Sequence, residues 1–426
     1  AALTPEERLQ AALVPDWEWP YKLPENWCWT YFKSISTIQT GKKDANYGSD
    51  EGKYPFFTCA AEPIRCHGYS FDCRAILLAG NGDINNINRY NGKFEAYQRT
   101  YVVKISEPLC FDYIFYWFKY RWFDFNKGKM FGTAIPYIRL GNLQEFPTPI
   151  PPLAEQQRIV VRIESLFSKL DEAKEKAQAV VDSFETRKAA ILHKAFTGEL
   201  TAKWRKEHGV GMESWEVRTL DSVCSSIFDG DHMPPPKAES GIPFLVISNV
   251  NTGHLTFENT RFVPQEYYDT LSDTRKPQLG DVLYTLVGSF GIPVVVNSKR
   301  PFCFQRHMAL LRPIDVSPQF LWYILQTPEM YDKASSIATG TAQLTVPIKG
   351  LRAMTIPRPN IAEQVEIVRI LDGFFAREQS AKEAAEAVLD QINLMKKSIL
   401  ARAFRGELGT NDPSEESAVE LLKQII

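Results

Sequence analysis

The chain has 426 residues, of which 44% are hydrophobic and 23% charged, with a formal net charge of −2 at pH 7. This length suffices for two or three domains with cores of their own, and the composition is typical of a globular protein. No apolar run reaches the roughly 18 residues of a membrane span and no basic-then-apolar leader is present, so we expect a cytoplasmic protein with no membrane partner. The near-zero charge excludes a global attraction to nucleic acid, so a DNA-binding surface has to be locally basic.

The first 150 residues predict a short helix followed by a globular domain. Thr4-Pro5-Glu6-Glu7 has the pattern of a capping box with proline at the first helical position, which indicates a helix within residues 1–18. In region 19–150, short β-branched or aromatic segments bounded by turn residues predict strands at 54–58, 75–78 and 100–105. The aromatic segment 111–125 predicts a buried helix.

Residues 151–200 predict a long helix, preceded by prolines and followed by Gly198. Its apolar residues alternate in steps of four and three up to a break at Arg187, and this seven-residue repeat is typical of a coiled coil. The predicted interface consists of Ile159, Ile163, Leu166, Leu170, Ala173, Ala177, Val180 and Phe184.

The second half of the chain repeats this order. Residues 201–214 form a predicted linker, and 215–357 a second domain with strands at 244–247, 282–286 and 308–312 and a helix at 319–326. Residues 358–408 predict a second long helix whose apolar pattern breaks at Glu378, and 409–426 a tail with a short helix after Asp412-Pro413. The interface predicted for the second long helix consists of Ile367, Leu371, Phe374, Ala381, Ala385, Val388 and Ile392.

The two halves are copies of one unit. Ala154-Glu155-Gln156 recurs at 362–364 and Gly132-Thr133-Ala134 at 340–342, both at a shift of 208 residues (363 minus 155), and about 27 of 69 aligned positions are identical. Each copy ends on Phe-x-Gly-Glu-Leu. The predicted fold is therefore mixed α+β, with two globular α/β domains, two long helices in an antiparallel coiled coil and an internal pseudo-twofold repeat. Two unrelated core helices of one large domain are the alternative.

Motifs for catalysis and cofactors are missing from the sequence. It has no Asn- or Asp-Pro-Pro-aromatic tetrapeptide of adenine methyltransferases and no P-loop, and Gly80-Asn81-Gly82 lacks the third glycine of a dinucleotide fingerprint. The seven cysteines show no disulfide framework. Cys59, Cys66, Cys73 and His67 are spaced more like buried thiols than like a zinc site, which stays the alternative. We expect a chain without catalytic residues, metal or bound cofactor.

The duplicated order of proline-rich lead, Ala-Glu-Gln, long helix and Phe-x-Gly-Glu-Leu, each behind a Gly-Thr-Ala, resembles the specificity subunit of type I restriction-modification systems. The resemblance covers nearly the whole chain. It implies two target-recognition domains that each read one half of a split, asymmetric site in double-stranded DNA, held apart by the paired helices. It also implies modification (methyltransferase) subunits, expected to be two, and restriction subunits as partners. S-adenosylmethionine, ATP and Mg belong to those partners.

Polar side chains near predicted strand ends are the candidates for DNA contact, because bases are read by polar groups while cations on phosphates fix the register. Each of them could instead be an ordinary surface or turn residue. In the first domain they are Lys42, Lys43, Asn81, Asn85, Arg99 and Thr133. In the second they are Asp229, Asp231, His232, Ser248, Asn249, Ser289, Arg306 and Thr341.

Two other functions stay open at this point. A self-contained DNA-modifying enzyme needs a cofactor or metal motif, which the sequence lacks, and binding of S-adenosylmethionine by the isolated chain would revive it. A coiled-coil adaptor that binds no DNA would keep the helices but would not need polar loops in both domains. The mixed charges of the long helices fit either a solvated face or a docking surface for the modification subunits.

Overall fold

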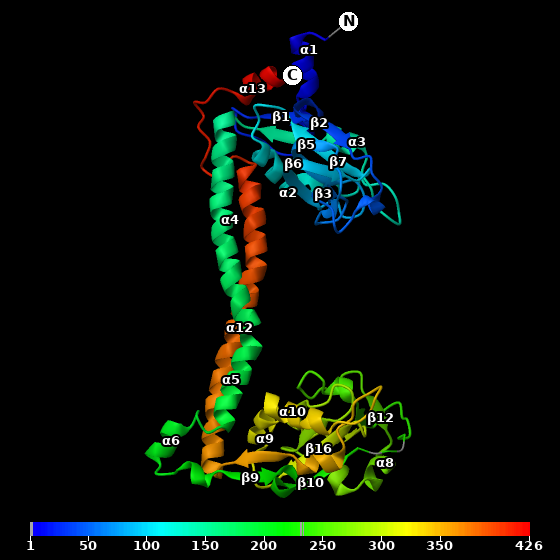
Figure 1. The fold of residues 1–426 in the computed structure, drawn as a ribbon, viewed down its shortest axis with the longest axis vertical. Coiled ribbons are helices and arrows are strands. Elements are labelled where there is room, and N and C mark those ends of the chain that lie inside the picture. The colour runs from blue at the N-terminus through cyan, green and yellow to red at the C-terminus, as the bar shows by residue number, and fades with distance from the viewer. Residues whose placement is uncertain (1–2, 231, 233) are drawn as a thin grey trace. The chain divides into compact units, whose positions relative to one another are not determined.

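A computed structural model describes residues 3–230, 232 and 234–426, in which the chain forms two compact units (Figure 1). One unit contains the chain up to Ala177 together with Ala387–Ile426, and the other contains Gln178–Glu386. Each unit thus combines a globular domain with parts of both long helices. The predicted order of domain, helix, domain and helix holds along the chain, but the compact units do not follow it.

The first domain is built on a six-stranded sheet in the order β2-β7-β5-β6-β3-β4. β3 runs parallel to β6, and the other neighbours are antiparallel. The strands are β2 (Ser36–Thr40), β3 (Tyr54–Phe57), β4 (Ile64–Cys66), β5 (Phe71–Ala79), β6 (Ile87–Ala96) and β7 (Thr100–Ile105). The strands predicted at 54–58, 75–78 and 100–105 all lie in this sheet.

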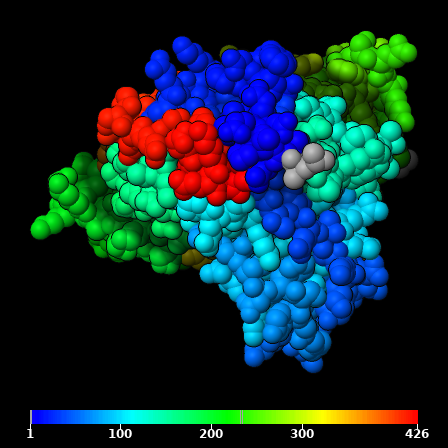
Figure 2. Space-filling view, turned by 90° about the horizontal axis from the view of Figure 1, so that it is seen from above, coloured from blue at the N-terminus to red at the C-terminus, as the bar shows by residue number. Residues whose placement is uncertain are grey.

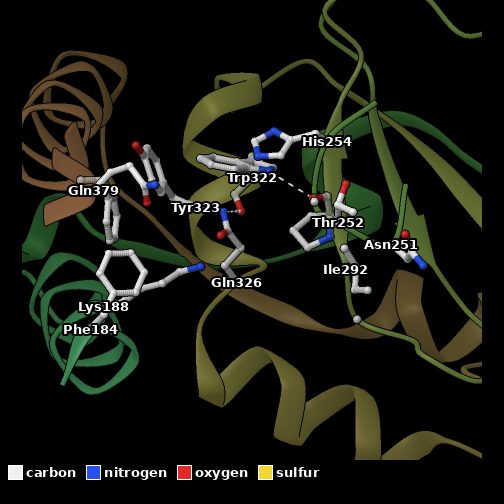
Figure 3. Close-up of a pocket in the computed structure, with 14 residues that line it drawn as sticks. Phe184, Lys188, Asn251, Thr252, His254, Ile292, Trp322, Tyr323, Gln326 and Gln379 are labelled. Atoms are coloured by element: carbon white, nitrogen blue, oxygen red, sulfur yellow. Dashed lines mark hydrogen bonds between the residues drawn. The ribbon is translucent and has the colours of Figure 1, made fainter. Parts of the chain in front are cut away.

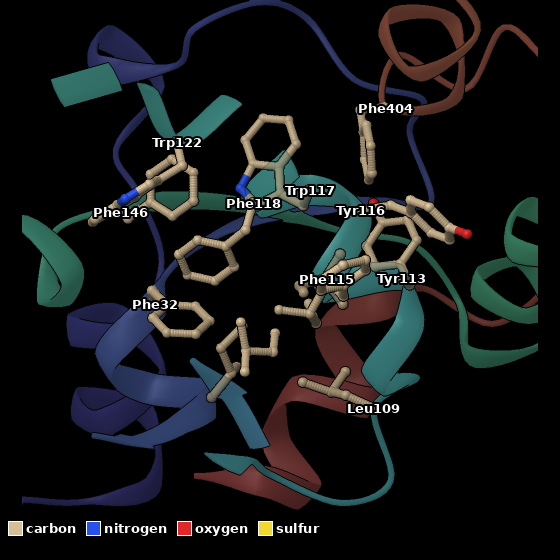
Figure 4. Close-up of a cluster of buried hydrophobic side chains, with 14 of the residues drawn as sticks. Phe32, Leu109, Tyr113, Phe115, Tyr116, Trp117, Phe118, Trp122, Phe146 and Phe404 are labelled. Carbon is tan, nitrogen blue, oxygen red and sulfur yellow. The ribbon is translucent and has the colours of Figure 1, made fainter. Parts of the chain in front are cut away.

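An aromatic core joins this domain to the long helices of its unit. The predicted buried helix is α2 (Phe111–Asn126), with Trp117, Phe118 and Trp122 fully buried (Figure 4). β1 (Cys28–Tyr31) pairs antiparallel with β8 (Pro147–Ile150), so the start of the domain meets its end. The short α3 (Leu140–Gln144) precedes β8.

The second domain splits its strands over three small sheets. The four-stranded sheet has the order β10-β16-β13-β14, the three-stranded sheet β12-β11-β15, and β17 pairs with β9. The strands are β9 (Glu216–Thr219), β10 (Cys224–Asp229), β11 (Ile242–Leu245), β12 (Arg261–Val263), β13 (Val282–Thr285), β14 (Pro293–Val295), β15 (Cys303–Phe304), β16 (Met308–Pro313) and β17 (Thr355–Arg358). The helices are α7 (Leu220–Val223), α8 (Gln265–Thr270), α9 (Pro318–Ile324), α10 (Pro328–Ile337) and α11 (Ile348–Ala353).

The first long helix is interrupted, whereas the second is continuous. α4 (Leu153–Asp182) ends at Asp182 and α5 (Phe184–Phe196) follows after Ser183, while α12 runs unbroken over Ile361–Ala403. At the interruption, Arg187 donates from Nη2 to the Val180 carbonyl at 3.2 Å and from Nε to Glu378 Oε2 at 2.7 Å. The two residues that break the predicted apolar patterns are therefore partners in an ion pair.

Both units contain an antiparallel helix pair. In the first unit, Ile159 and Ile163 near the start of α4 share a core with Leu400 near the end of α12. In the second, Ile367 and Leu371 near the start of α12 share a core with residues near the end of α5. Start packs beside end in each case, which is the predicted antiparallel orientation.

The interface residues predicted from the seven-residue repeat avoid solvent on α4 and α5, but two of those predicted on α12 are exposed. None of the eight interface residues predicted before Arg187 is exposed. On α12, Ala381 is exposed and Val388 is 40% exposed, whereas the following residues Lys382 and Leu389 are half-buried. Ala385 and Ile392 on the same helix are nonetheless buried, at 8% and 3% exposed, so the deviation is confined to these two positions and does not accumulate along the helix. Ala381 and Val388 were therefore wrongly assigned to the interface.

The Glu and Gln side chains of the duplicated Ala-Glu-Gln motif form hydrogen bonds with the globular domain at the start of each long helix. Glu155 and Glu363 are fully buried, and each accepts a hydrogen bond at 3.0 Å from a tryptophan ring nitrogen, of Trp27 and Trp215 respectively. Gln156 accepts from the Cys110 amide at 2.9 Å, and the equivalent Gln364 bonds to the Ser317 amide at 3.0 Å in the same way. The motif therefore holds the start of a long helix to its own domain.

The duplicated phenylalanine of Phe-x-Gly-Glu-Leu packs the end of a long helix against a domain. In the first unit Phe404, just after α12, packs on Trp117 with ring centroids 5.0 Å apart (Figure 4). In the second unit Phe196, the last residue of α5, packs on Phe320 of α9 at 5.3 Å. Each domain thus holds the end of the helix that begins in the other copy.

The predicted linker 201–214 is a packed structural element. It forms α6 (Ala202–Glu207), and the guanidinium of Arg205 lies 2.6 Å from the carboxylate of Glu363. Thr201 donates to the same carboxylate oxygen at 2.7 Å. In the first unit Glu155 receives a comparable bond from Thr410 at 3.3 Å but forms no ion pair with any described residue, and burial raises its pKa.

The two ends of the chain pack together in the first unit, as Figure 2 shows for the blue and red segments. α1 (Pro5–Ala12) has the predicted capping box, in which the Thr4 hydroxyl accepts from the Glu7 amide at 3.2 Å. Arg8 donates to the Ile426 carbonyl at 3.0 Å. The tail helix α13 (Ala418–Ile425) is capped by Ser417 rather than by Asp412, which forms a turn with Ser414.

Candidate nucleic-acid interface

In the first domain, backbone hydrogen bonds tie the predicted DNA-contacting loops to one another. The Gln98 amide donates to the Lys43 carbonyl at 2.9 Å, and the Gly80 amide to the Arg99 carbonyl at 2.8 Å. Asn81, which follows Gly80, forms a bridge with Tyr137 at the base of the hairpin 131–137 that carries Thr133. The loops with Lys42, Asn81, Arg99 and Thr133 therefore meet in one region.

The side chains of these loops are free to meet a ligand to different degrees. Lys42, Arg99 and Thr133 are exposed and Asn81 is half-buried, whereas the Lys43 ammonium lies 4.5 Å from the centre of the Tyr47 ring. Asn85 is exposed, but its amide nitrogen donates to Asp83 at 2.9 Å in a local turn. Lys42, Asn81 and Arg99 are thus the better-placed candidates in this domain.

The second domain repeats the same backbone connections. The Leu286 amide donates to the His307 carbonyl at 2.8 Å, and Val287 forms a bridge with Thr345 at the base of the hairpin that carries Thr341. Ser289 and Thr341 are both exposed. The loop after β13 and the Gly-Thr-Ala hairpin are therefore neighbours here, as the loop after β5 and its hairpin are in the first domain.

A glycine brings the first loop of each domain close to the parallel strand pair. A Cβ atom on Gly41 would lie 2.0 Å from the Ala96 carbonyl oxygen, and one on Gly230 would lie 2.2 Å from that of Phe304. Only glycine permits this approach. The structure thereby equates the loop that follows Gly41 and carries Lys42 with the loop that follows Gly230 and carries His232, two loops that were selected independently from the sequence.

Three of the predicted residues in the second domain surround one open pocket. Asp229, His232 and Arg306 line a hollow of about 410 Å³ together with His307, Gln343 and Thr345. The His232 ring nitrogen lies 2.8 Å from Asp229, and Arg275 lies 3.8 Å from the same carboxylate. The Arg275 guanidinium offsets the negative charge of Asp229 beside a surface proposed to meet phosphates.

Arg99 of the first domain corresponds to His307 of the second. Arg99 and His307 accept the equivalent backbone bonds, so Arg306 corresponds to Gln98. Burial, and next the charge of Arg306, lowers the pKa of His307. His307, Gln343 and Thr345 were not selected from the sequence, although the constant shift of 208 residues would have indicated His307 from Arg99.

One predicted residue does not belong to the interface. Asn249 is only 3% exposed and holds a turn, because it accepts from the Val246 amide at 3.0 Å and donates to the Glu258 carbonyl at 3.0 Å. Its polarity serves the fold and was misread as a base contact. Ser248 is exposed and, like Ser289 and Thr341, does not line the pocket, so its role in DNA contact stays a prediction. Asp231 lies outside the described residues.

A larger hollow of about 710 Å³ lies elsewhere in the second unit (Figure 3). Its lining includes Phe184 and Lys188 of α5, Trp322 and Tyr323 of α9, and His254. None of the predicted DNA-contacting residues lines it. We therefore place it outside the candidate interface.

The described part of the chain holds no cluster of three His, Cys, Asp or Glu side chains suited to a metal ion. Cys59, Cys66 and Cys73 are free thiols, and burial raises the pKa of the last two. Among the described residues, no helix combines the length and apolarity required to cross a bilayer.

Comparisons with known proteins agree with the duplicated architecture. A family model described as the type I restriction modification DNA specificity domain matches residues 24–181 and again 212–389. The type I restriction enzyme EcoDI specificity subunit of Escherichia coli is 28% identical over 431 residues, which cover 95% of either chain. The EcoKI specificity subunit of E. coli K12 is 28% identical over 316 residues, 69% of this chain and 66% of that protein.

Solved structures share the fold. A chain from a structure titled as the basis of complex assembly and conformational transition of the type I R-M system has a TM-score of 0.68 at 22% identity, covering 91% of this chain and 100% of that one. The HsdS subunit from Thermoanaerobacter tengcongensis has a TM-score of 0.61 at 22% identity, covering 92% and 100%. Since the family model matches more than half of the sequence, in two copies, the chain belongs to the type I restriction-modification DNA specificity family.

Proposed function

We propose that this chain is the specificity subunit of a type I restriction-modification complex and reads a bipartite, asymmetric site in double-stranded DNA. The observation that carries the proposal is the repetition of one loop arrangement with different side chains. Lys42, Asn81 and Arg99 in the first domain correspond to a loop with His232 and to Val287 and His307 in the second. Equal scaffolds with unequal polar groups are what two half-sites of different sequence require.

The chain's own part in the reaction is positioning. We propose that each domain places a modification subunit over a target adenine, and that the helix pairs fix the spacing between the half-sites. S-adenosylmethionine, ATP and Mg act on the partner subunits in this proposal, and a restriction subunit completes the complex. The two alternatives, an adaptor that binds no DNA and a self-contained enzyme, remain outcomes of the experiment below.

A map of N6-methyladenine tests the function. The chain is expressed with its modification subunit in a host that lacks adenine methylation, and the methylated positions are read by single-molecule sequencing. We expect one split, asymmetric motif methylated on both strands. A complex that forms but leaves the DNA unmethylated would favour the adaptor, and methylation without the partner would favour a self-contained enzyme.

Alanine in place of Arg99 or Arg306 is expected to weaken DNA binding by the complex. Loss of a direct base contact costs about 1–3 kcal/mol and relaxes the sequence preference at one position, whereas loss of a phosphate contact weakens all sequences alike and lowers the salt dependence. Fluorescence anisotropy with cognate and altered duplexes at several salt concentrations separates the two cases. Arg261→Ala on β12, exposed and outside the pocket, is the control; affinity equal to that of this control would remove either arginine from the interface.

A further inference from the structure

The Gly-Thr-Ala hairpins are the most sharply repeated exposed feature of the two domains. Residues 132–134 are identical to 340–342, yet none of the seven residues before them or the eight after them matches at the same shift. All six residues of the two tripeptides are exposed. Because surface residues diverge readily after duplication, a short exposed identity between two divergent flanks needs a specific reason.

The fold explains only the glycines. Gly132 and Gly340 have positive φ angles of 84° and 116°, and a Cβ atom there would lie 2.7 and 2.5 Å from the Ile135 and Gln343 carbonyl oxygens. A residue with a side chain is therefore strained at either position.

The threonine and alanine have no such internal reason. Within the described part of the chain, the Thr133 and Thr341 hydroxyls make no hydrogen bond, and Ala134 and Ala342 are outside the cores. A contact with something outside the chain, the same at both hairpins, accounts for their identity.

The hairpins also have the same setting. Phe131 bridges Tyr137 in the first and Thr339 bridges Thr345 in the second, again 208 residues apart. Each hairpin pairs with the neighbouring loop that carries Asn81 or precedes Ser289. In both domains the identical Gly-Thr-Ala hairpin therefore lies beside a recognition loop whose sequence differs. The hairpin is suited to a partner that is the same at both half-sites.

Two common partners are conceivable, the DNA backbone and the modification subunit, and the side chains favour a protein. Ile135 is 61% exposed and Leu344 is 47% exposed, so each hairpin presents an apolar side chain to solvent. The cations around the first hairpin, Lys129 and Arg139, have Ile337 and Pro347 as their equivalents. A phosphate site common to both domains would share cations, and these hairpins do not.

We propose that the two Gly-Thr-Ala hairpins are docking points for the modification subunit, one copy on each domain. The inference rests on the proposed function, because it presumes a partner present twice. The hairpin would align the modification subunit with the adjacent recognition loop. The two domains could then read different DNA sequences while each contacts the same surface of a modification subunit. Neutral, exposed Thr and Ala with a flanking aliphatic side chain fit the rim of a protein interface.

Charge placed at one hairpin tests the inference. Ala134→Glu and, separately, Ala342→Glu are prepared in the full chain and reconstituted with the modification subunit. We expect each variant to lose at least tenfold in methylation of the adenine of one half-site and to keep the other, read strand by strand. Without DNA, the mass of the complex should fall by one modification subunit. Ala11→Glu on α1, also an exposed alanine, is the matched control.

The reversed charge separates the proposed partner from DNA. Ala134→Lys should impair docking as Ala134→Glu does. If the hairpin instead met phosphate, lysine would raise DNA affinity and glutamate lower it, with the mass of the complex unchanged, and the inference would be overturned. Equal methylation of both half-sites in every variant would also overturn it. A wild-type complex that forms but methylates no split motif would instead refute the proposed function.

Discussion

Replacing Arg205 by methionine will destabilise the second unit by about 3–5 kcal/mol, because it leaves the Glu363 carboxylate buried without its cation. Glu363 is fully buried and Arg205 is 7% exposed, with 2.6 Å between guanidinium and carboxylate. Trp215 and Thr201 also bond to Glu363, so the loss affects the junction of α6, α12 and the second domain. Chemical denaturation gives the free energy of unfolding, and hydrogen exchange of 361–371 against 153–163 shows which unit opens.

Two controls distinguish a buried charge from a lost contact. Arg369 pairs with Glu366 at 2.7 Å but is 69% exposed, so Arg369→Ala should cost no more than about 1 kcal/mol. Adding Glu363→Gln to Arg205→Met removes the unpaired charge and should restore part of the stability. If the double variant is no more stable than the single one, charge burial is not the cause.

One added heptad in each long helix will lengthen the unread gap of the recognition site. Seven residues extend a helix by about 10.5 Å, which corresponds to about three base pairs at about 3.4 Å each. The insertions belong after Ala177 in α4 and after Glu386 in α12, where the two units divide. Both half-site words should stay the same, because the recognition loops are untouched. A map of N6-methyladenine reads gap and words together.

Insertion into one helix alone is the control. The extra heptad then has no partner and displaces one of the antiparallel pairs, such as Lys396 with Asp171 or Arg187 with Glu378. We expect that variant to lose methylation. An unchanged gap in the doubly extended chain would contradict the proposed spacing role of the helices, and altered words would show that the helices contribute to reading.

Several features of the fold could be predicted because they are local in sequence. Alternation of four and three identified the long helices, and β-branched segments identified strands such as β7 (Thr100–Ile105). The exposure of Ala381 and Val388 on α12 could not be predicted from an ideal repeat, because it depends on which side chains of the facing helix lie opposite each position. The role of 201–214 was missed for a related reason. Arg205 reads as an ordinary surface cation until Glu363, 158 residues away, is seen beside it.

In the candidate interface, too, some side chains could be predicted from local sequence and others could not. Glycine-bracketed turns after strands pointed to Asn81 and Ser289, and the structure pairs both loops with the Gly-Thr-Ala hairpins. A position after a strand, without a glycine, was the reason for choosing Asn249, which is buried, because a polar residue there can serve a turn as well as a ligand.

The sequence by itself determined that the chain is duplicated, that each of two globular domains is followed by a long helix, and that no recognisable catalytic motif is present. Those features depend on periodicity and on comparison of the chain with itself. Only the tertiary structure decided which residues hold the start of one long helix and the end of the other in each compact unit, namely Glu155 and Phe404 in the first unit and Glu363 and Phe196 in the second. The physical reason is that burial of a carboxylate or an aromatic ring is set by partners up to hundreds of residues away, which no local pattern encodes.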